Sequence, residues 1–137
     1  MDFYATLATP VGPAFGHLAD PSRLGDWLPE VVAAAAGPRS PGSAIADFPL
    51  TVRVDEVQVD ATGEVTAFEP PWLVGYRLFI GSRAHVLQVT CTAQADGTRI
   101  HVHQPDDAAP LIIDLARLTQ ALAAAYPPRP GQPPREP

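Results

Sequence analysis

The order of its sequence patterns constrains the fold of this chain more than any single motif does. Residues 3–9, FYATLAT, alternate as a half-buried strand does, and residues 14–31, AFGHLADPSRLGDWLPEV, then carry two short helical patterns. Strand-like alternation follows as far as residue 103, and one long helical pattern comes last, at 110–126. We therefore predict an α+β fold in which an antiparallel sheet grips a C-terminal helix, an arrangement that commonly leaves a cavity between the two.

Caps and turn residues mark the boundaries of these elements. Asp20-Pro21 is typical of a helix start, because the aspartate can accept a hydrogen bond from a free amide and proline suits the first helical position. A phase change at Asp55-Glu56, the Gly81-Ser82 pair and the run from Ala95 to Gly97 each indicate a turn between strands. Such short turns imply antiparallel pairing.

The last pattern, PLIIDLARLTQALAAAY, predicts a helix over 110–126 that is about 26 Å long. Its leucines recur at helical spacing, at 111, 115, 118 and 122. Asp106 and Asp107 precede it, where acidic side chains would favour the helix dipole. We expect one domain over 1–126, with a loop at 37–43 and a proline-rich, disordered tail over 127–137.

Composition excludes several classes of partner. A formal net charge of −6 and scattered basic residues argue against nucleic acid. One cysteine, Cys91, can form neither an internal disulfide nor a thiolate metal site, which fits a reducing cytoplasm. We see no targeting segment and no apolar run of the length that spans a bilayer, so we expect a cytoplasmic protein without a membrane span, as a monomer or homodimer.

Three segments carry a resemblance to a known group of proteins: AFGHLADPSRLGDWLPEV, GEVTAFEPPWLVGYRLF at 63–79 and GTRIHVHQ at 97–104. They resemble the SRPBCC superfamily, which includes START-like and Bet v 1-like domains, the polyketide cyclase/dehydrase family and the Hsp90-ATPase-activator-like proteins. The resemblance implies a helix-grip fold, with a curved seven-stranded antiparallel sheet around a long C-terminal helix and two short helices after the first strand. It also implies an apolar cavity for lipids, polyketides or other aromatic molecules. A cone-shaped α+β fold that also hosts polyketide cyclases is the second choice, since it usually starts with its helices.

Three side chains are candidates for acid–base chemistry in such a cavity. His85 is in phase with the apolar residues of its strand and has the side chain best suited to proton transfer near neutral pH, although a histidine near a strand end is usually structural. Tyr76 can bind a ligand carbonyl or hydrogen-bond to the protein itself. Glu69 is in phase with Val65, and it would serve as a base if buried; exposure at a turn is the alternative we favour.

Further side chains are predicted to contact a ligand. Arg83 can bind a carboxylate or enolate, although solvation beside the neighbouring turn is the interpretation we favour. Trp27 is expected to be a core or cavity-wall anchor. The predicted ligand-binding set is Trp27, Tyr76, Arg83, His85, Leu87, Leu115 and Leu118.

The remaining histidines and the cysteine are expected to have no catalytic role. His101 and His103 alternate with core positions and should face solvent; an H-x-H pair can bind metal, but spacing shows no third ligand. His17 is expected at the surface, and Cys91 in the core as a small apolar side chain. We predict no metal and no cofactor, since no phosphate loop, dinucleotide fingerprint or zinc pattern is present.

Three functions remain open. The first is binding of a hydrophobic small molecule in the cavity, without chemistry. The second is a polyketide cyclase or aromatase that folds a poly-keto chain and moves protons with Tyr76, His85, Glu69 or Arg83. The third is a protein-interaction domain similar to the Hsp90-activator branch, which requires an exposed apolar patch.

Overall fold

A computed structural model describes residues 1–34, 47–107 and 109–126. The predicted loop at 37–43 and the predicted tail at 127–137 lie outside these residues. The elements, in chain order, are β1 (Asp2–Leu7), α1 (Val11–Leu18), the 3-10 helix η1 (Pro21–Asp26), β2 (Val31–Ala34), β3 (Asp47–Val54), β4 (Val57–Glu69), β5 (Leu73–Ile80), β6 (Arg83–Gln94), β7 (Gly97–His103) and α2 (Leu115–Ala125).

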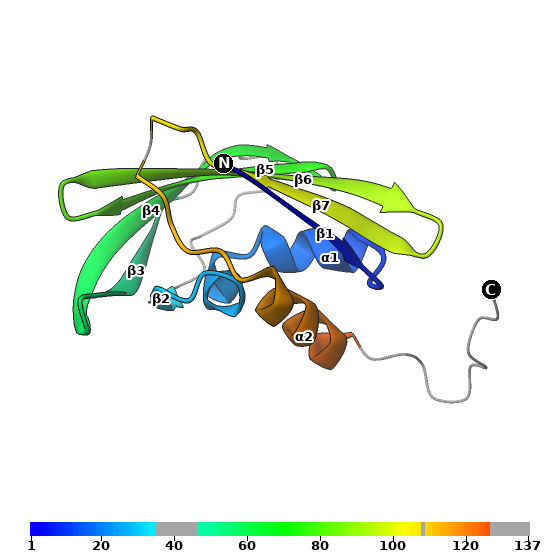
Figure 1. The fold of residues 1–137 in the computed structure, drawn as a ribbon, viewed down its shortest axis with the longest axis horizontal. Coiled ribbons are helices and arrows are strands. Elements are labelled where there is room, and N and C mark those ends of the chain that lie inside the picture. The colour runs from blue at the N-terminus through cyan, green and yellow to red at the C-terminus, as the bar shows by residue number, and fades with distance from the viewer. Residues whose placement is uncertain (35–46, 108, 127–137) are drawn as a thin grey trace.

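The strands form one seven-stranded sheet in the order β1-β7-β6-β5-β4-β3-β2, and every neighbouring pair is antiparallel. Figure 1 shows the sheet curving over the helices, with β3 bent away from the plane of β5, β6 and β7. The predicted sheet, the two short helices after the first strand and the C-terminal helix are therefore all present. This is the helix-grip arrangement expected from the sequence.

The predicted turns lie where their residues indicated. Asp55 and Glu56 both have positive φ, at 49° and 68°, which matches the two-residue hairpin turn whose twist suits the flanking strands. Gly81 also has positive φ, at 63°, in the turn between β5 and β6. Asp20 caps η1 by accepting a hydrogen bond from the Ser22 amide at 3.0 Å, as its pairing with proline predicted.

The C-terminal helix α2 begins later in the sequence than predicted. This helix begins at Leu115 rather than at residue 110, and Asp114 is its N-cap, accepting a hydrogen bond from the Arg117 amide at 2.9 Å. Residues 111–114 are not helical because their backbone groups bond to other parts of the fold. The Asp114 amide donates to the Trp27 carbonyl at 2.9 Å, and the Leu111 amide and carbonyl both bond to the Gln104 side chain.

Consequently α2 is about 16 Å long and covers less of the sheet than a helix over 110–126 would. It packs mainly against η1, whereas α1 packs against β6 and β7. Figure 1 shows the same arrangement, with α1 directly beneath the sheet and α2 farther from it. Asp106 and Asp107 lie well before the helix, so the predicted dipole role belongs to Asp114 instead.

A single apolar core lies between the concave face of the sheet and the helices. Its largest fully buried side chains come from β1, α1, η1 and its C-terminal flank, the inner faces of β3, β5, β6 and β7, and α2. Gly63 on β4 makes room for one of them, because a Cβ atom there would lie 2.4 Å from the Phe48 ring. None of the helices within the described ranges is long and apolar enough to cross a membrane.

Candidate functional site

The concave face of the sheet carries two of the predicted catalytic residues on neighbouring strands. Tyr76 on β5 pairs with Leu87 on β6, and Leu78 pairs with His85, so Tyr76 and His85 are diagonal neighbours on the buried face. Residues in such diagonal positions are about 7–8 Å apart, and their Cβ atoms are somewhat closer than that. The fold therefore brings the phenol and the imidazole to one region beneath the sheet.

The Tyr76 hydroxyl makes a hydrogen bond within the protein. The side chain is fully buried, and its hydroxyl donates a hydrogen bond to the Leu18 carbonyl at 2.6 Å. Leu18 is the last residue of α1, where carbonyls have no intrahelical donor. Tyr76 thus supplies a donor from the sheet to a carbonyl at the end of α1. The sequence left two roles open for this hydroxyl, binding a ligand or hydrogen-bonding to the protein, and the structure shows the second.

His85 is buried near the start of β6. Its Nδ1 lies 2.7 Å from the Ala109 carbonyl, which can only accept, so Nδ1 carries the hydrogen. In the neutral ring, Nε2 is then the nitrogen able to accept a proton. The hydrogen bond fixes the tautomer and orients the ring against the segment that leads to α2.

Glu69 and Arg83 do not join Tyr76 and His85. Both side chains are exposed. In β4 the pairing with β5 shifts between Val65 and Ala67, and this bulge reverses the alternation that placed Glu69 in phase with Val65. Phe68 faces the core instead, with its ring centroid 5.8 Å from that of Phe15. Arg83 begins β6 beside the tight turn, which leaves it at the margin of the sheet.

The predicted apolar contacts lie partly in the core. Leu87 on β6 and Leu118 on α2 are fully buried, and Leu115 at the start of α2 is half-buried. The concave side is occupied by packed side chains that form one cluster. An open hollow of about 320 Å³ lies elsewhere, lined by Asp60, Ala61, Thr62, Phe79 and Gly81 on β4, β5 and the turn after β5. It is therefore not the cavity expected between sheet and helix.

His17 is buried, which corrects the expectation that it lies at the surface. Only 3 % of the residue is exposed, and its Nε2 lies 2.7 Å from the Asp26 carboxylate. The contact joins α1 to the end of η1. The sequence did contain a signal for burial, because Ala14, His17 and Leu18 occupy one face at helical spacing.

Trp27 carries the most unusual polar atom of the core. The residue is fully buried, and its indole Nε1 has no hydrogen-bond partner among the described residues. Buried polar groups are almost always paired, so this N–H is an exception that requires an explanation. The Trp27 carbonyl accepts from Asp114, and the Ile112 amide donates to the Glu30 carboxylate at 3.2 Å. We call this contact of Trp27 and Glu30 with residues 111–114 the η1–α2 seam.

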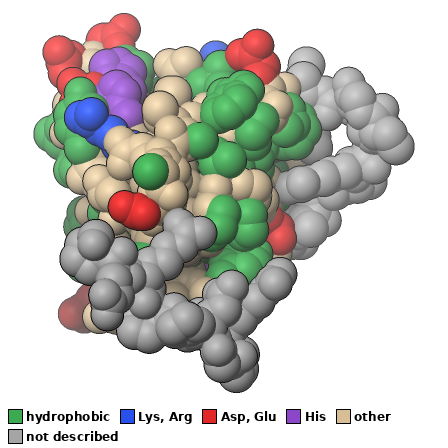
Figure 2. All heavy atoms as spheres, turned by 90° about the vertical axis from the view of Figure 1, so that its right-hand side faces the viewer, with side chains coloured by type: hydrophobic (Ala, Val, Ile, Leu, Met, Phe, Trp, Pro, Cys, Tyr) green, Lys and Arg blue, Asp and Glu red, His purple; other side chains and the backbone are tan. Residues whose placement is uncertain are grey.

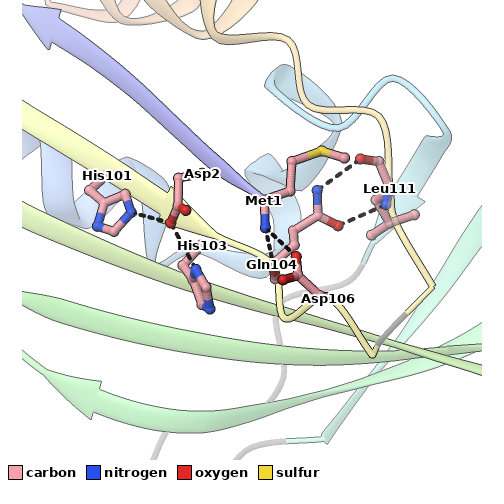
Figure 3. A network of polar contacts seen from close by, with 7 residues as sticks. All are labelled: Met1, Asp2, His101, His103, Gln104, Asp106 and Leu111. Atoms are coloured by element: carbon pink, nitrogen blue, oxygen red, sulfur yellow. Dashed lines mark hydrogen bonds and ion pairs between the residues drawn. The ribbon is translucent and has the colours of Figure 1, made fainter.

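A second polar cluster lies on the outer face of the sheet. His101 and His103 on β7 face away from the core, as predicted, and Asp2 on β1 lies opposite them (Figure 3). One oxygen of Asp2 is 2.8 Å from His101 Nε2 and 2.8 Å from His103 Nδ1. Both contacts lower the pKa of Asp2 from 3.8 to about 2. The spacing of residues in the sequence could not identify Asp2 as a partner, because Asp2 and His103 are about a hundred residues apart and only the pairing of β1 with β7 brings them together.

Comparison with solved structures places this architecture among known folds. The protein CV1439 from Chromobacterium violaceum has a TM-score of 0.63 at 15% identity, covering 94% of this chain and 98% of that one. Ara h 8.0201 has a TM-score of 0.58 at 17% identity, covering 91% of this chain and 92% of that one. The di-domain ARO/CYC StfQ from the steffimycin biosynthetic pathway has a TM-score of 0.61 at 14% identity, covering 88% of this chain. At these identities the likeness concerns the fold.

The chain spans 39% of the length of StfQ, so it corresponds to a part of that protein. No curated protein sequence matches the chain. A family described as "Polyketide cyclase / dehydrase and lipid transport" matches residues 4–124, which include most of β1, all of β2 to β7 as described and nearly all of α2. The resemblance to the SRPBCC superfamily is thereby confirmed, and the chain belongs to the polyketide cyclase/dehydrase and lipid transport family.

Proposed function

We propose that the chain binds a hydrophobic small molecule, of polyketide, aromatic or lipid-like chemistry, under the concave face of the sheet at the η1–α2 seam. The observation that carries the proposal is the fully buried indole N–H of Trp27, which has no partner among the described residues. A bound carbonyl or hydroxyl oxygen would accept from this N–H. The family matched by the chain is consistent with such a ligand.

The side chains around the seam are suited to an apolar ligand. Leu24 lies on η1 and Leu28 directly follows Trp27 in the sequence. Leu118 lies on α2, which packs against η1. All three leucines are fully buried. Ligand sites are commonly lined by apolar side chains with a few polar groups that fix orientation. In this proposal Trp27 is the orienting group, and the leucines supply the contact area.

Entry of a ligand requires α2 to move, because packed side chains occupy the concave side. The helix has eleven residues and buries two of them, Leu118 and Leu122. Short helices depend on tertiary packing for their stability, so α2 is the element that can separate at the lowest cost. A ligand would then replace the leucine contacts that α2 makes in the closed form.

The tryptophans allow a direct test. Trp72 is half-exposed, so Trp72→Phe leaves Trp27 as the sole tryptophan without disturbing the core. We expect Trp27 emission in this variant to change on titration with an aromatic polyketide or a fatty acid. A ligand at about 100 times its Kd should also stabilise the fold by about 2.7 kcal/mol.

The matched variant is Trp27→Phe with Trp72 retained. It should weaken binding of an oxygen-bearing aromatic ligand by about five- to tenfold, because one hydrogen bond is lost. Binding of a hydrocarbon of the same shape should change much less. Equal weakening for both ligands, or no binding of either class by the parent protein, would contradict the proposal.

A cyclase-type reaction is the second candidate, and the tautomer of His85 is what favours it. With Nδ1 donating to the Ala109 carbonyl, Nε2 is the nitrogen that can accept a proton from a ligand. We expect His85→Gln to reduce turnover of a poly-keto substrate at least a hundredfold while ligand affinity changes little. Turnover unaffected by this substitution would exclude His85 as the base.

A further inference from the structure

Three side chains able to bind a metal ion meet on the outer face of the sheet, at the pairing of β1 with β7. Asp2 pairs with His103 across the two strands, and Tyr4 pairs with His101. The ligand atoms of Asp2, His101 and His103 all lie within 4.8 Å of one another. Two imidazoles and one carboxylate are a donor set that suits zinc and related divalent transition metals.

We propose that Asp2, His101 and His103 form a binding site for a divalent transition metal ion of the zinc class, with at least one coordination position open to solvent. We call these three residues the edge triad. The site is on the opposite face of the sheet from Trp27, Tyr76 and His85, so it is independent of the proposed ligand site.

The distances within the edge triad are close to those that a metal needs. Asp2 Oδ1 is 2.8 Å from both imidazole nitrogens, whereas donors around a tetrahedral zinc ion are about 3.3 Å apart. Lengthening each of these two contacts by about half an ångström would bring it to that spacing, and the third pair, between the two imidazole nitrogens, is within 4.8 Å.

Neighbouring groups fix the orientation of the ligands. The His101 ring stacks on Tyr4, with centroids 4.5 Å apart and planes 5° from parallel, and this stacking holds Nε2 toward Asp2. Arg99 lies 5.4 Å from the centroid of the same tyrosine ring. His101 and His103 are two residues apart on one strand, so the backbone of β7 sets their separation. Positioned side chains of this kind lose less freedom on binding than mobile ones do.

The surroundings of the edge triad are accessible and mixed in charge. The side chains of His101, His103 and Asp2 are 35%, 42% and 45% exposed, so a metal ion can reach them from solvent. The Met1 nitrogen nearby is bonded to the Gln104 carbonyl and to Asp106 rather than to the triad (Figure 3). Figure 2 shows histidine side chains at the surface with acidic side chains beside them.

The experiment is a titration of the full chain with Zn²⁺ by calorimetry, repeated with Co²⁺ and monitored by its visible absorption. We expect one ion per chain, with two nitrogen ligands and one oxygen ligand indicated by the Co²⁺ spectrum. Asp2→Asn, His101→Gln and His103→Gln should each weaken binding at least tenfold. The control Asp107→Asn changes an exposed acidic residue outside the triad and should leave the affinity unchanged.

Circular dichroism of each metal-free variant verifies that it is folded, and imidazole NMR signals identify the ligands in the parent protein. Zn²⁺ should shift the signals of His101 and His103, while those of the buried His17 and His85 stay in place. The absence of stoichiometric binding, or affinity that survives in the folded triad variants, would overturn the proposal. Neither result bears on ligand binding at the η1–α2 seam.

Discussion

Tyr76→Phe separates a structural role for this tyrosine from a chemical one. The substitution keeps the ring, which packs edge-on against Phe48 with centroids 6.2 Å apart, and it removes the hydroxyl that donates to the Leu18 carbonyl at 2.6 Å. Leu18 is fully buried at the end of α1, so water cannot easily replace the lost donor. The perturbation is therefore one buried carbonyl deprived of a partner.

The expected loss in the free energy of unfolding is about 2 kcal/mol, in the middle of the range for a buried polar group left unsatisfied. For a domain of this size that corresponds to a fall in Tm of roughly 6–10 °C. Urea denaturation measured by circular dichroism gives the free energy, and a thermal melt gives the Tm. Turnover or ligand binding, measured well below the new Tm, should be unchanged.

Tyr4→Phe is the matched control, because it removes the same hydroxyl from a tyrosine that is 57% exposed. Its ring remains able to stack on His101, and we expect its free energy of unfolding to lie within about 0.5 kcal/mol of the parent value. If both variants lose the same stability, the helix-capping explanation is wrong. A loss of turnover in Tyr76→Phe without a loss of stability would instead restore the catalytic role.

Other features of the structure lead to three further predictions. Burial raises the pKa of the Cys91 thiol from 9.0 to about 11. At pH 8 the native thiol should therefore react with an alkylating reagent at least about a hundredfold more slowly than the thiol of the urea-unfolded chain, and equal rates would contradict its burial. Gly63→Ala should lower the free energy of unfolding by about 1–3 kcal/mol through contact with Phe48, whereas Gly16→Ala, on an open helix face, should raise it by about 0.5–1 kcal/mol. Urea denaturation measures both changes, and changes of the same sign would refute the packing argument. Because the pKa of Asp2 is lower in the folded chain, ionised Asp2 should stabilise the fold fully above about pH 4, and this stabilisation should be lost as the pH falls toward 2. The Tm values of Asp2→Asn and the parent should therefore converge near pH 2, and a difference in Tm that is constant with pH would contradict this prediction.

Features set by local chemistry were predictable from the sequence. The cap at Asp20 and the turn at Asp55-Glu56 depend on neighbours in the chain, and both were confirmed. The burial of Tyr76 and His85 followed from simple alternation along uninterrupted strands. The family and the fold followed from several such features in a fixed order.

Features set by distant contacts were not predictable in the same way. The start of α2 moved because Gln104 and Trp27 occupy backbone groups that a longer helix would need. Exposure of Glu69 was the alternative favoured from the sequence, but the bulge between Val65 and Ala67 that turns its side chain outward leaves no clear mark there. The partner of His101 and His103 is Asp2, and only the register of β1 against β7 brings it there.

The strand order also has a consequence for the route by which the chain folds. Within the described residues, β1 with β7 is the single pairing between strands distant in sequence; each other pair joins consecutive strands. Closing that long loop costs about 3 kcal/mol more entropy than closing a two-residue hairpin, so the hairpins should assemble first and β1 should dock last. An ion held between Asp2 and His103 would bind only after docking. It would thus slow the undocking of β1 and leave hairpin formation unaffected.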